Sequence, residues 1–291
     1  MGGRGSSYNR SILPPTPVLA QAIDDDDDQD DQQQAQMLNA TLQKGTANTP
    51  SGYTLDDFKQ MDDQTAASLV EWANSAMTLS KDFHDDPTQR LIHALGIDKP
   101  MENIGGRALQ KYVDAGATVL YRGLKGSSTN GVYTDADTIA DSIRSGNQFS
   151  TGGWGGQAHG GGMYMTDRYD GTKYYGTDHV IGAVFNSKAN HIDGGSLMLK
   201  ADSWLKSRPV FRNTLAKLVG VSSSANTYTL LTKGKTPSEA YRARSIVALA
   251  MGYTSLSDRV IGNENYYVIL DRSTLSTSKY NHRKSMKKSG T

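Results

Sequence analysis

The spacing of the apolar residues changes close to residue 115, and this change limits the possible folds more than any other feature of the chain. Between residues 54 and 114, apolar side chains recur every three or four positions, which is typical of amphipathic helices. Beyond Ala115 and Gly116 they gather in short runs that predict buried strands, namely TVLYRG (118–123), GMYMT (162–166), VIGAVFN (180–186) and YYVIL (266–270). The chain therefore changes from predicted helices to predicted strands close to this point.

The chain divides by composition into four segments. Residues 1–50 contain an acidic run from Asp24 to Asp31 and few apolar side chains, so we expect a disordered acidic leader. Residues 51–115 are expected to form a helical lobe, residues 116–280 a strand-rich domain, and residues 281–291 a basic tail. Short charged ends of this kind are usually solvated, so neither predicts specific nucleic-acid binding.

Residues that start and stop helices set the expected helix ends. Thr54 and Asp57 form a capping-box pattern that begins one amphipathic helix reaching Met77. Thr134 and Asp137 form the same pattern ahead of a helix that ends at Gly146. Three further helices are expected: one between Asp86 and Gly96, one over Arg107–Val113, and one between Thr236 and Gly252.

Composition also excludes several kinds of site. The chain has no Cys, which rules out disulfides, Cys-ligated zinc and a thiol nucleophile. Its six His are scattered with no pair at i, i+4, so we expect no metal site. No apolar run reaches the roughly 18 to 20 residues of a membrane span, so we expect no membrane partner. The run GGWGGQAHGGG (152–162) neither follows a strand with dinucleotide-binding spacing nor opens a helix, which argues against a Rossmann domain.

Three segments carry the chemistry that the sequence suggests: Tyr121-Arg122-Gly123, residues 162–176 and residues 263–275. Together they resemble the ADP-ribosyltransferase superfamily, whose diphtheria-toxin-like and poly-ADP-ribose-polymerase-like members have a Gly-x-Tyr strand, a short helix and a second Tyr. Tyr164 and Tyr175 stand eleven positions apart, which matches the spacing in that family. The resemblance implies an α+β fold, a split β-sandwich of two small antiparallel-rich sheets behind an N-terminal helical lobe. It makes residues 116–280 the catalytic domain and NAD the substrate, bound between the sheets.

The resemblance also implies roles for individual residues. The rings of Tyr164 and Tyr175 would sandwich the cationic nicotinamide, since a pyridinium ring gains from contact with aromatic faces. Arg122 would hold a phosphate or ribose of NAD in fork geometry. The family places its catalytic glutamate just before the last strand, and Glu264 is the one of the four glutamates with that position. The implied catalytic set is Glu264, Arg122 and Tyr164, and the implied NAD-binding set is Arg122, Gly123, Ser150, Thr151, Tyr164, Thr172 and Tyr175.

The acceptor of ADP-ribose is suggested by the same resemblance. Arg122 replaces the His of poly-ADP-ribose-forming members, so a mono-ADP-ribosyltransferase is implied. The stretches ALAMGYTSL (248–256) and YYVILDRSTL (266–275) are similar to ADP-ribosyltransferase domains of phage minor head proteins. This implies a host protein or nucleotide as acceptor, phage head proteins as further partners, and a location in the virion or the host cytoplasm. Gly262 stands where arginine-modifying toxins have Glu or Gln, so arginine is not expected as the acceptor.

Two other functions stay open at this point. The same fold could serve as a virion structural or interaction protein that has lost catalysis, because fold does not determine function. The same site could also act as an NAD glycohydrolase, with water as the acceptor. Turnover of NAD separates the first of these from an enzyme, and the identity of the product separates transfer from hydrolysis.

Overall fold

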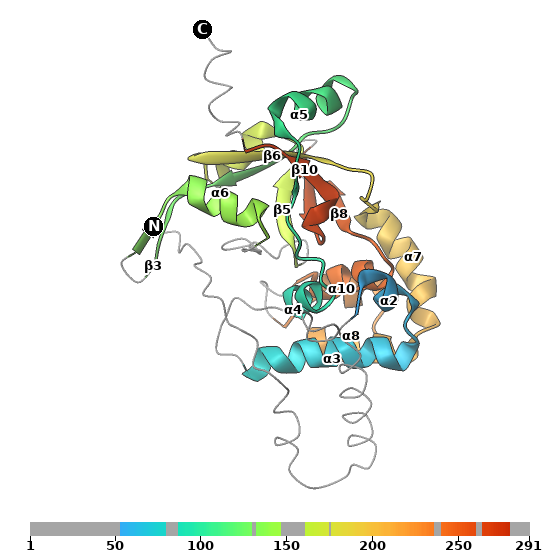
Figure 1. Cartoon of the computed structure of the whole chain (residues 1–291). Coiled ribbons are helices and arrows are strands. Elements are labelled where there is room, and N and C mark those ends of the chain that lie inside the picture. The colour runs from blue at the N-terminus through green and yellow to red at the C-terminus, as the bar shows by residue number, and fades with distance from the viewer. Residues whose placement is uncertain are drawn as a thin grey trace.

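The computed structural model of the chain describes residues 53–79, 87–129, 132–146, 161–174, 176–235, 240–259 and 264–279 (Figure 1). Several expectations concern residues outside these ranges. They are the acidic leader, the basic tail, the helix start at Thr236, Gly262, and the NAD-binding candidates Ser150, Thr151 and Tyr175.

Helices and strands occur in separate runs along the described chain, with consecutive helices over residues 55–94 and 194–250. The helices are α2 (Leu55–Gln60), α3 (Asp63–Leu79), α4 (Pro87–Ala94), α5 (Gly105–Asp114), α6 (Ala136–Arg144), α7 (Gly194–Lys206), α8 (Pro209–Val219), α9 (Thr227–Thr232) and α10 (Arg242–Ala250), with 3-10 turns η2 (Tyr169–Tyr174) and η4 (Arg272–Thr274). The strands are β1 (Glu102–Asn103), β2 (Leu120–Leu124), β3 (Ser127–Thr129), β4 (Val132–Thr134), β5 (Met163–Thr166), β6 (His179–Phe185), β7 (His191–Asp193), β8 (Ser255–Arg259), β9 (Asn265–Ile269) and β10 (Leu275–Thr277). The expected α+β class is confirmed.

Eight strands form one mixed sheet in the order β1-β10-β6-β2-β5-β9-β8-β7, and β3 and β4 form a separate hairpin. Strands β2 and β5 share a single register pair, Tyr121 with Thr166, whereas β2 pairs with β6 along its whole length. In Figure 1, β6 runs across the view while β5 and β8 run down it. The strands therefore differ from the expectation of two separate sheets: they form one sheet whose two halves are joined at a narrow connection between β2 and β5.

Two hydrophobic cores lie on the two faces of this sheet. The larger core joins the helices to sheet residues that include Tyr164, Leu256 and Val268. The smaller core joins α6 to residues of β2, β5 and β6, among them Leu120 and Met165. Successive strand residues point to opposite faces, so Tyr164 and Met165 serve different cores. The sheet is thus buried on both faces at β5.

The helical layer combines helices from both ends of the chain. Helix α3 packs against α8, and α10 packs against α2 and α4 (Figure 1). Helix α8 has no side-chain cap of its own at Arg208. The carboxylate of Asp63 in α3 instead accepts hydrogen bonds from the amides of Val210 and Phe211, each at 2.9 Å. Residues 194–250 therefore complete a helical layer that residues 53–97 begin.

Most of the expected helix ends and strands are confirmed. Thr54 and Asp57 form a complete capping box at the start of α2. Gly96, Gly146 and Gly252 have positive φ just beyond α4, α6 and α10, as expected of glycines that end helices. The runs predicted as strands form β2, β5, β6 and β9.

Two expectations about helices are wrong. The single helix expected from Thr54 to Met77 is two helices, because Asp62 accepts a hydrogen bond from the amide of Thr65 at 2.8 Å and starts α3 afresh. The cap of α6 is Asp135, which accepts from the amide of Thr138, and not Thr134. Thr134 ends β4, where it pairs with Ser127, so its backbone belongs to the hairpin.

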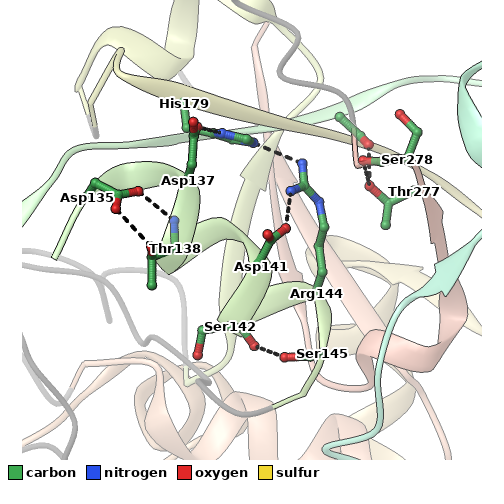
Figure 2. Close-up of polar contacts among 11 residues, drawn as sticks. Asp135, Asp137, Thr138, Asp141, Ser142, Arg144, Ser145, His179, Thr277 and Ser278 are labelled. Carbon is green, nitrogen blue, oxygen red and sulfur yellow. Dashed lines mark hydrogen bonds and ion pairs between the residues drawn. The ribbon is translucent and has the colours of Figure 1, made fainter.

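Helix α6 is fastened to the sheet by a chain of polar side chains (Figure 2). The ring of His179, at the start of β6, lies between Asp137 and Arg144 of the helix. Its Nδ1 is 2.5 Å from Asp137, and its Nε2 is 2.9 Å from the Arg144 guanidinium. Arg144 also pairs with Asp141 at 3.2 Å. Because a guanidinium can only donate hydrogen bonds, Nε2 of His179 accepts the bond from Arg144. Nδ1 of His179 then carries the ring proton and donates a hydrogen bond to Asp137, so the imidazole is neutral.

Candidate functional site

The three segments singled out in the sequence meet at the end of β5. Thr166, the last residue of that strand, is buried and pairs in register with Tyr121 of β2 on one side and Tyr266 of β9 on the other. The narrow connection between the two halves of the sheet lies at this same point. Residues far apart in the chain are therefore brought together where the sheet divides.

Glu264, the candidate catalytic glutamate, lies half-buried just before β9. Its Oε1 accepts a hydrogen bond of 2.6 Å from the hydroxyl of Thr166, a residue 98 positions earlier. The next residues of the two segments are also joined, because the amide of Asn265 donates to Asp167 at 3.0 Å and the amide of Asp167 donates back to the carbonyl of Asn265 at 3.3 Å. Glu264 is thus tied to the end of β5 through its own side chain and through the backbone of its neighbour Asn265.

Arg122, the second candidate, reaches from β2 to the neighbouring strand β5. Its side chain is buried, and its Nη1 donates to the carbonyl of Tyr164 at 2.8 Å. Alternation along β2 puts Arg122 on the strand face opposite Tyr121. Arg122 and Glu264 are therefore linked through β5, whose Tyr164 carbonyl binds the first and whose Thr166 hydroxyl binds the second.

A second guanidinium lies close to Arg122. Arg272 of η4 is fully buried and donates to the carbonyls of Ile143 and Gly146 at 3.0 Å and 2.8 Å. Burial lowers the pKa of Arg272 to about 10, Asp98 and Asp271 oppose this shift, and the positive charge of Arg122 adds to it. Arg272 therefore joins the end of α6 to the last part of the chain while it keeps its charge at neutral pH.

Gly123 and Thr172 contact each other, as members of one site would, but both take part in packing. A side chain at Gly123 would place its Cβ 2.2 Å from the carbonyl of Gly176 and 2.4 Å from that of Thr172. Thr172 is buried, and its hydroxyl donates to the carbonyl of Tyr169 at 2.7 Å. In this structure, glycine at position 123 lets η2 pack directly on β2, and the Thr172 hydroxyl stabilises η2.

Tyr164 lies in the larger hydrophobic core. Its side chain is 3% exposed, so one of its faces would have to be uncovered before the ring could stack on a ligand. Its expected partner, Tyr175, lies outside the described residues, as do Ser150 and Thr151. Of the implied sets, the structure groups Arg122, Gly123, Tyr164, Thr172 and Glu264 around β5 and η2.

Sequence reasoning assigned no role to three residues of its own segments that belong to this group. Thr166 binds Glu264, and the rings of Tyr121 and Tyr169 meet edge to face with centroids 5.6 Å apart. Both rings are half-buried, and burial, with Tyr169 adding to it, raises the pKa of the Tyr121 hydroxyl. Tyr121 precedes Arg122 and Thr166 ends the strand run, but only the register of β2, β5 and β9 shows that they are neighbours.

Neither a metal nor a membrane is indicated in the part of the chain that the structure describes. Within it, no group of three or more His, Cys, Asp or Glu side chains could hold a metal ion. None of its helices is long and apolar enough to cross a membrane.

Comparison with known proteins found no matching family model, no matching curated protein and no matching solved structure.

Proposed function

We propose that the protein is a mono-ADP-ribosyltransferase, which cleaves NAD between nicotinamide and ribose and transfers the ADP-ribose. The observation that carries the proposal is the hydrogen bond from Thr166 to Glu264. It fixes a carboxylate at the point where the three segments that resemble the family meet. A fixed carboxylate suits this reaction because the charge that it must stabilise appears only in the transition state.

The chemistry breaks one bond and forms another. The bond between C1′ of the ribose and the pyridinium nitrogen breaks, and its electron pair leaves with nicotinamide, which becomes neutral. Positive charge develops on the ribose as this happens, and the carboxylate of Glu264 stabilises it and orients the sugar hydroxyls. The acceptor then forms a bond to C1′ and loses a proton. No metal or redox partner is required for this balance.

Other features support the same proposal. The narrow connection between the two halves of the sheet supports the proposed split β-sandwich, although the halves belong to one sheet. Arg122 supplies a guanidinium at that division, suited to a phosphate or ribose of NAD, and it would have to be uncovered to reach NAD because it is buried on the face opposite Tyr121. Tyr164 and Tyr175 are the proposed partners of the nicotinamide ring, and the half-buried rings of Tyr121 and Tyr169 offer further aromatic surface beside Thr166.

The proposed acceptor is a host protein or nucleotide that receives a single ADP-ribose. Arg122 in the first segment favours single transfer, because chain-forming members of the family carry His there. Similarity to phage minor head proteins favours delivery with the virion into a host cell, with head proteins as further partners. Acceptor choice would depend on loops around the site and not on the catalytic set.

Labelled NAD tests the proposal. The purified full-length protein is incubated with NAD labelled in the adenosine part, with and without bacterial lysate, and the products are identified by mass spectrometry. A discrete protein or nucleotide carrying one ADP-ribose supports transfer. Free ADP-ribose alone would assign the site to an NAD glycohydrolase. Unchanged NAD in both reactions would favour a virion structural or interaction protein that has lost catalysis.

A further inference from the structure

The Thr166 hydroxyl has a defined direction, which makes its contact with Glu264 specific. The backbone amide of Arg168 donates to Thr166 Oγ1 at 3.1 Å. With that lone pair engaged, the hydroxyl proton points to Glu264 Oε1, 2.6 Å away. Thr166 is 1% exposed, so water does not compete for this bond. One oxygen of the carboxylate is therefore held by a buried donor whose own orientation is fixed by the backbone.

Gly171 leaves the space that the same oxygen occupies. A Cβ at this position would lie 1.9 Å from Glu264 Oε1, 2.9 Å from its Cδ and 3.1 Å from Thr166 Cγ2. Gly171 does not have a positive φ, so its backbone conformation is open to any residue. Glycine is required here by the space that the carboxylate occupies. The atom in the way is the end of a flexible side chain, so a methyl group at Gly171 would displace Glu264 more readily than it would unfold η2.

Among the described residues no hydrogen bond to the other carboxylate oxygen, Glu264 Oε2, is found, and the charge of Arg168 lies close enough to interact with the carboxylate. A carboxylate with one oxygen held and one available can accept a hydrogen bond from a sugar hydroxyl without rotating. The energetic advantage is that no side-chain freedom is lost as the charge develops on the sugar.

We propose that Thr166 and Gly171 are positioning residues, which together fix the Glu264 carboxylate so that Oε2 faces the ribose of NAD. This inference rests on the proposed function, and neither residue is assigned a direct contact with the substrate. The alternative is that the contact serves only to hold the segment before β9 in place.

Two substitutions separate these roles. Thr166→Val removes the hydroxyl at nearly constant volume, and Thr166→Ser keeps it. We expect Thr166→Val to lower kcat for nicotinamide release about 10-fold to 100-fold, the cost of a misplaced catalytic group, with KM for NAD nearly unchanged. Thr166→Ser should recover most of the rate. Gly171→Ala, which displaces the same carboxylate without removing a hydrogen bond donor, should reproduce the loss in kcat.

A matched control lies in the helical layer. There the hydroxyl of Thr214 donates to the carboxylate of Glu71 at 3.0 Å, which is the same kind of contact in a partly buried position outside the candidate site. Thr214→Val removes a bond of equal kind and should leave kcat and KM as in the parent. Circular dichroism and thermal unfolding of each variant establish that it is folded.

The double variant Thr166→Val with Glu264→Gln decides the mechanism of the effect. If Thr166 acts through Glu264, its substitution adds no further loss once the carboxylate is gone. An additional loss of about 10-fold in the double variant would overturn the inference, as would a Thr166→Val enzyme that is folded and as fast as the parent. A parent protein that releases no nicotinamide would overturn the proposed function and this inference together, so the two failures are distinguishable.

Discussion

At the scale of single residues, two glycines of the candidate site are required by their contacts and not by their backbone angles. Neither Gly123 nor Gly171 has a positive φ. At Gly171 the contact is a movable carboxylate, whereas at Gly123 it is the backbone of Thr172 and Gly176. Added volume at these two positions should therefore have different consequences: a displaced side chain at the first and a strained backbone at the second.

Gly123→Ala tests this difference through stability. Its methyl group would meet two backbone carbonyls at 2.2 Å and 2.4 Å, so η2 has to move away from β2. We expect a loss of about 1 to 3 kcal/mol in the free energy of unfolding, the usual cost of overpacking. Urea denaturation at constant pH measures it.

Gly106→Ala is the matched control. Gly106 lies in α5, a Cβ added there would meet no atom within 4 Å, and alanine favours helices. Its substitution should leave stability unchanged or raise it by up to about 1 kcal/mol. Equal losses in the two variants would show that the contacts of Gly123 do not decide its role.

At the scale of the elements, side chains from distant parts of the chain complete helix ends and fasten helices to the sheet. Asp63 of α3 satisfies two amides at the start of α8, and His179 of β6 joins two side chains of α6 (Figure 2). Each of these contacts combines hydrogen bonding with a specific placement of one element against another. Loss of either should loosen an element without removing apolar surface from the cores.

Asp63→Ala tests the cap on α8. Removing the carboxylate leaves the amides of Val210 and Phe211 without their acceptor at the positive end of a helix dipole. The free energy of unfolding should fall by about 1 to 2 kcal/mol, as it does when other N-caps are lost. Asp56→Ala, at an exposed position in α2, should cost less than about 0.5 kcal/mol. A result in the opposite order would contradict the assigned cap.

His179 gives the stability of the protein a pH dependence. Burial lowers the pKa of His179, the bond to Asp137 opposes this shift, and the charge of Arg144 adds to it. His179 in the folded state therefore takes up a proton at a lower pH than in the unfolded chain, where the pKa of His is about 6.5. Stability from this group is fully present above that value and decreases as the pH falls below it, by at most about 1.4 kcal/mol per pH unit.

Unfolding curves between about pH 8 and about pH 5 measure this dependence for the parent and for His179→Gln. The slope that His179 contributes is the difference between the two, because burial also lowers the pKa of His191 and gives both proteins a common background. The exposed His93, paired with Asp98, provides the control substitution His93→Gln. Parallel curves for the parent and His179→Gln would rule out the buried imidazole as the source.

At the scale of the whole molecule, a divided sheet lies between a helical layer and α6, and the candidate site lies at the division. Local patterns predicted much of this. The spacing of apolar residues predicted α4, α5 and the four central strands, because each depends on its own periodicity. The helix break at Asp62 and the start of α6 at Asp135 were not predicted. At each place a neighbouring Asp, and not the expected residue, caps the helix.

Other features depend on contacts that no local pattern contains. The cap of α8 comes from Asp63, 147 positions before Val210. The pairing of Tyr121, Thr166 and Tyr266 depends on strand register, so Thr166 could not be recognised as the partner of Glu264. Resemblance suggested which residues matter, while the hydrogen bonds of the folded chain indicate how two of them are linked through β5.

The central claim is that this chain cleaves NAD with the carboxylate of Glu264. The most direct measurement is the rate of nicotinamide release from NAD by the parent, by Glu264→Gln and by Glu71→Gln, whose carboxylate makes the matching contact with Thr214. We predict release by the parent, an unchanged rate for Glu71→Gln, and a rate lower by about 10²-fold or more for Glu264→Gln at similar NAD affinity. Equal rates for the parent and Glu264→Gln, or no release by the parent, would contradict the claim.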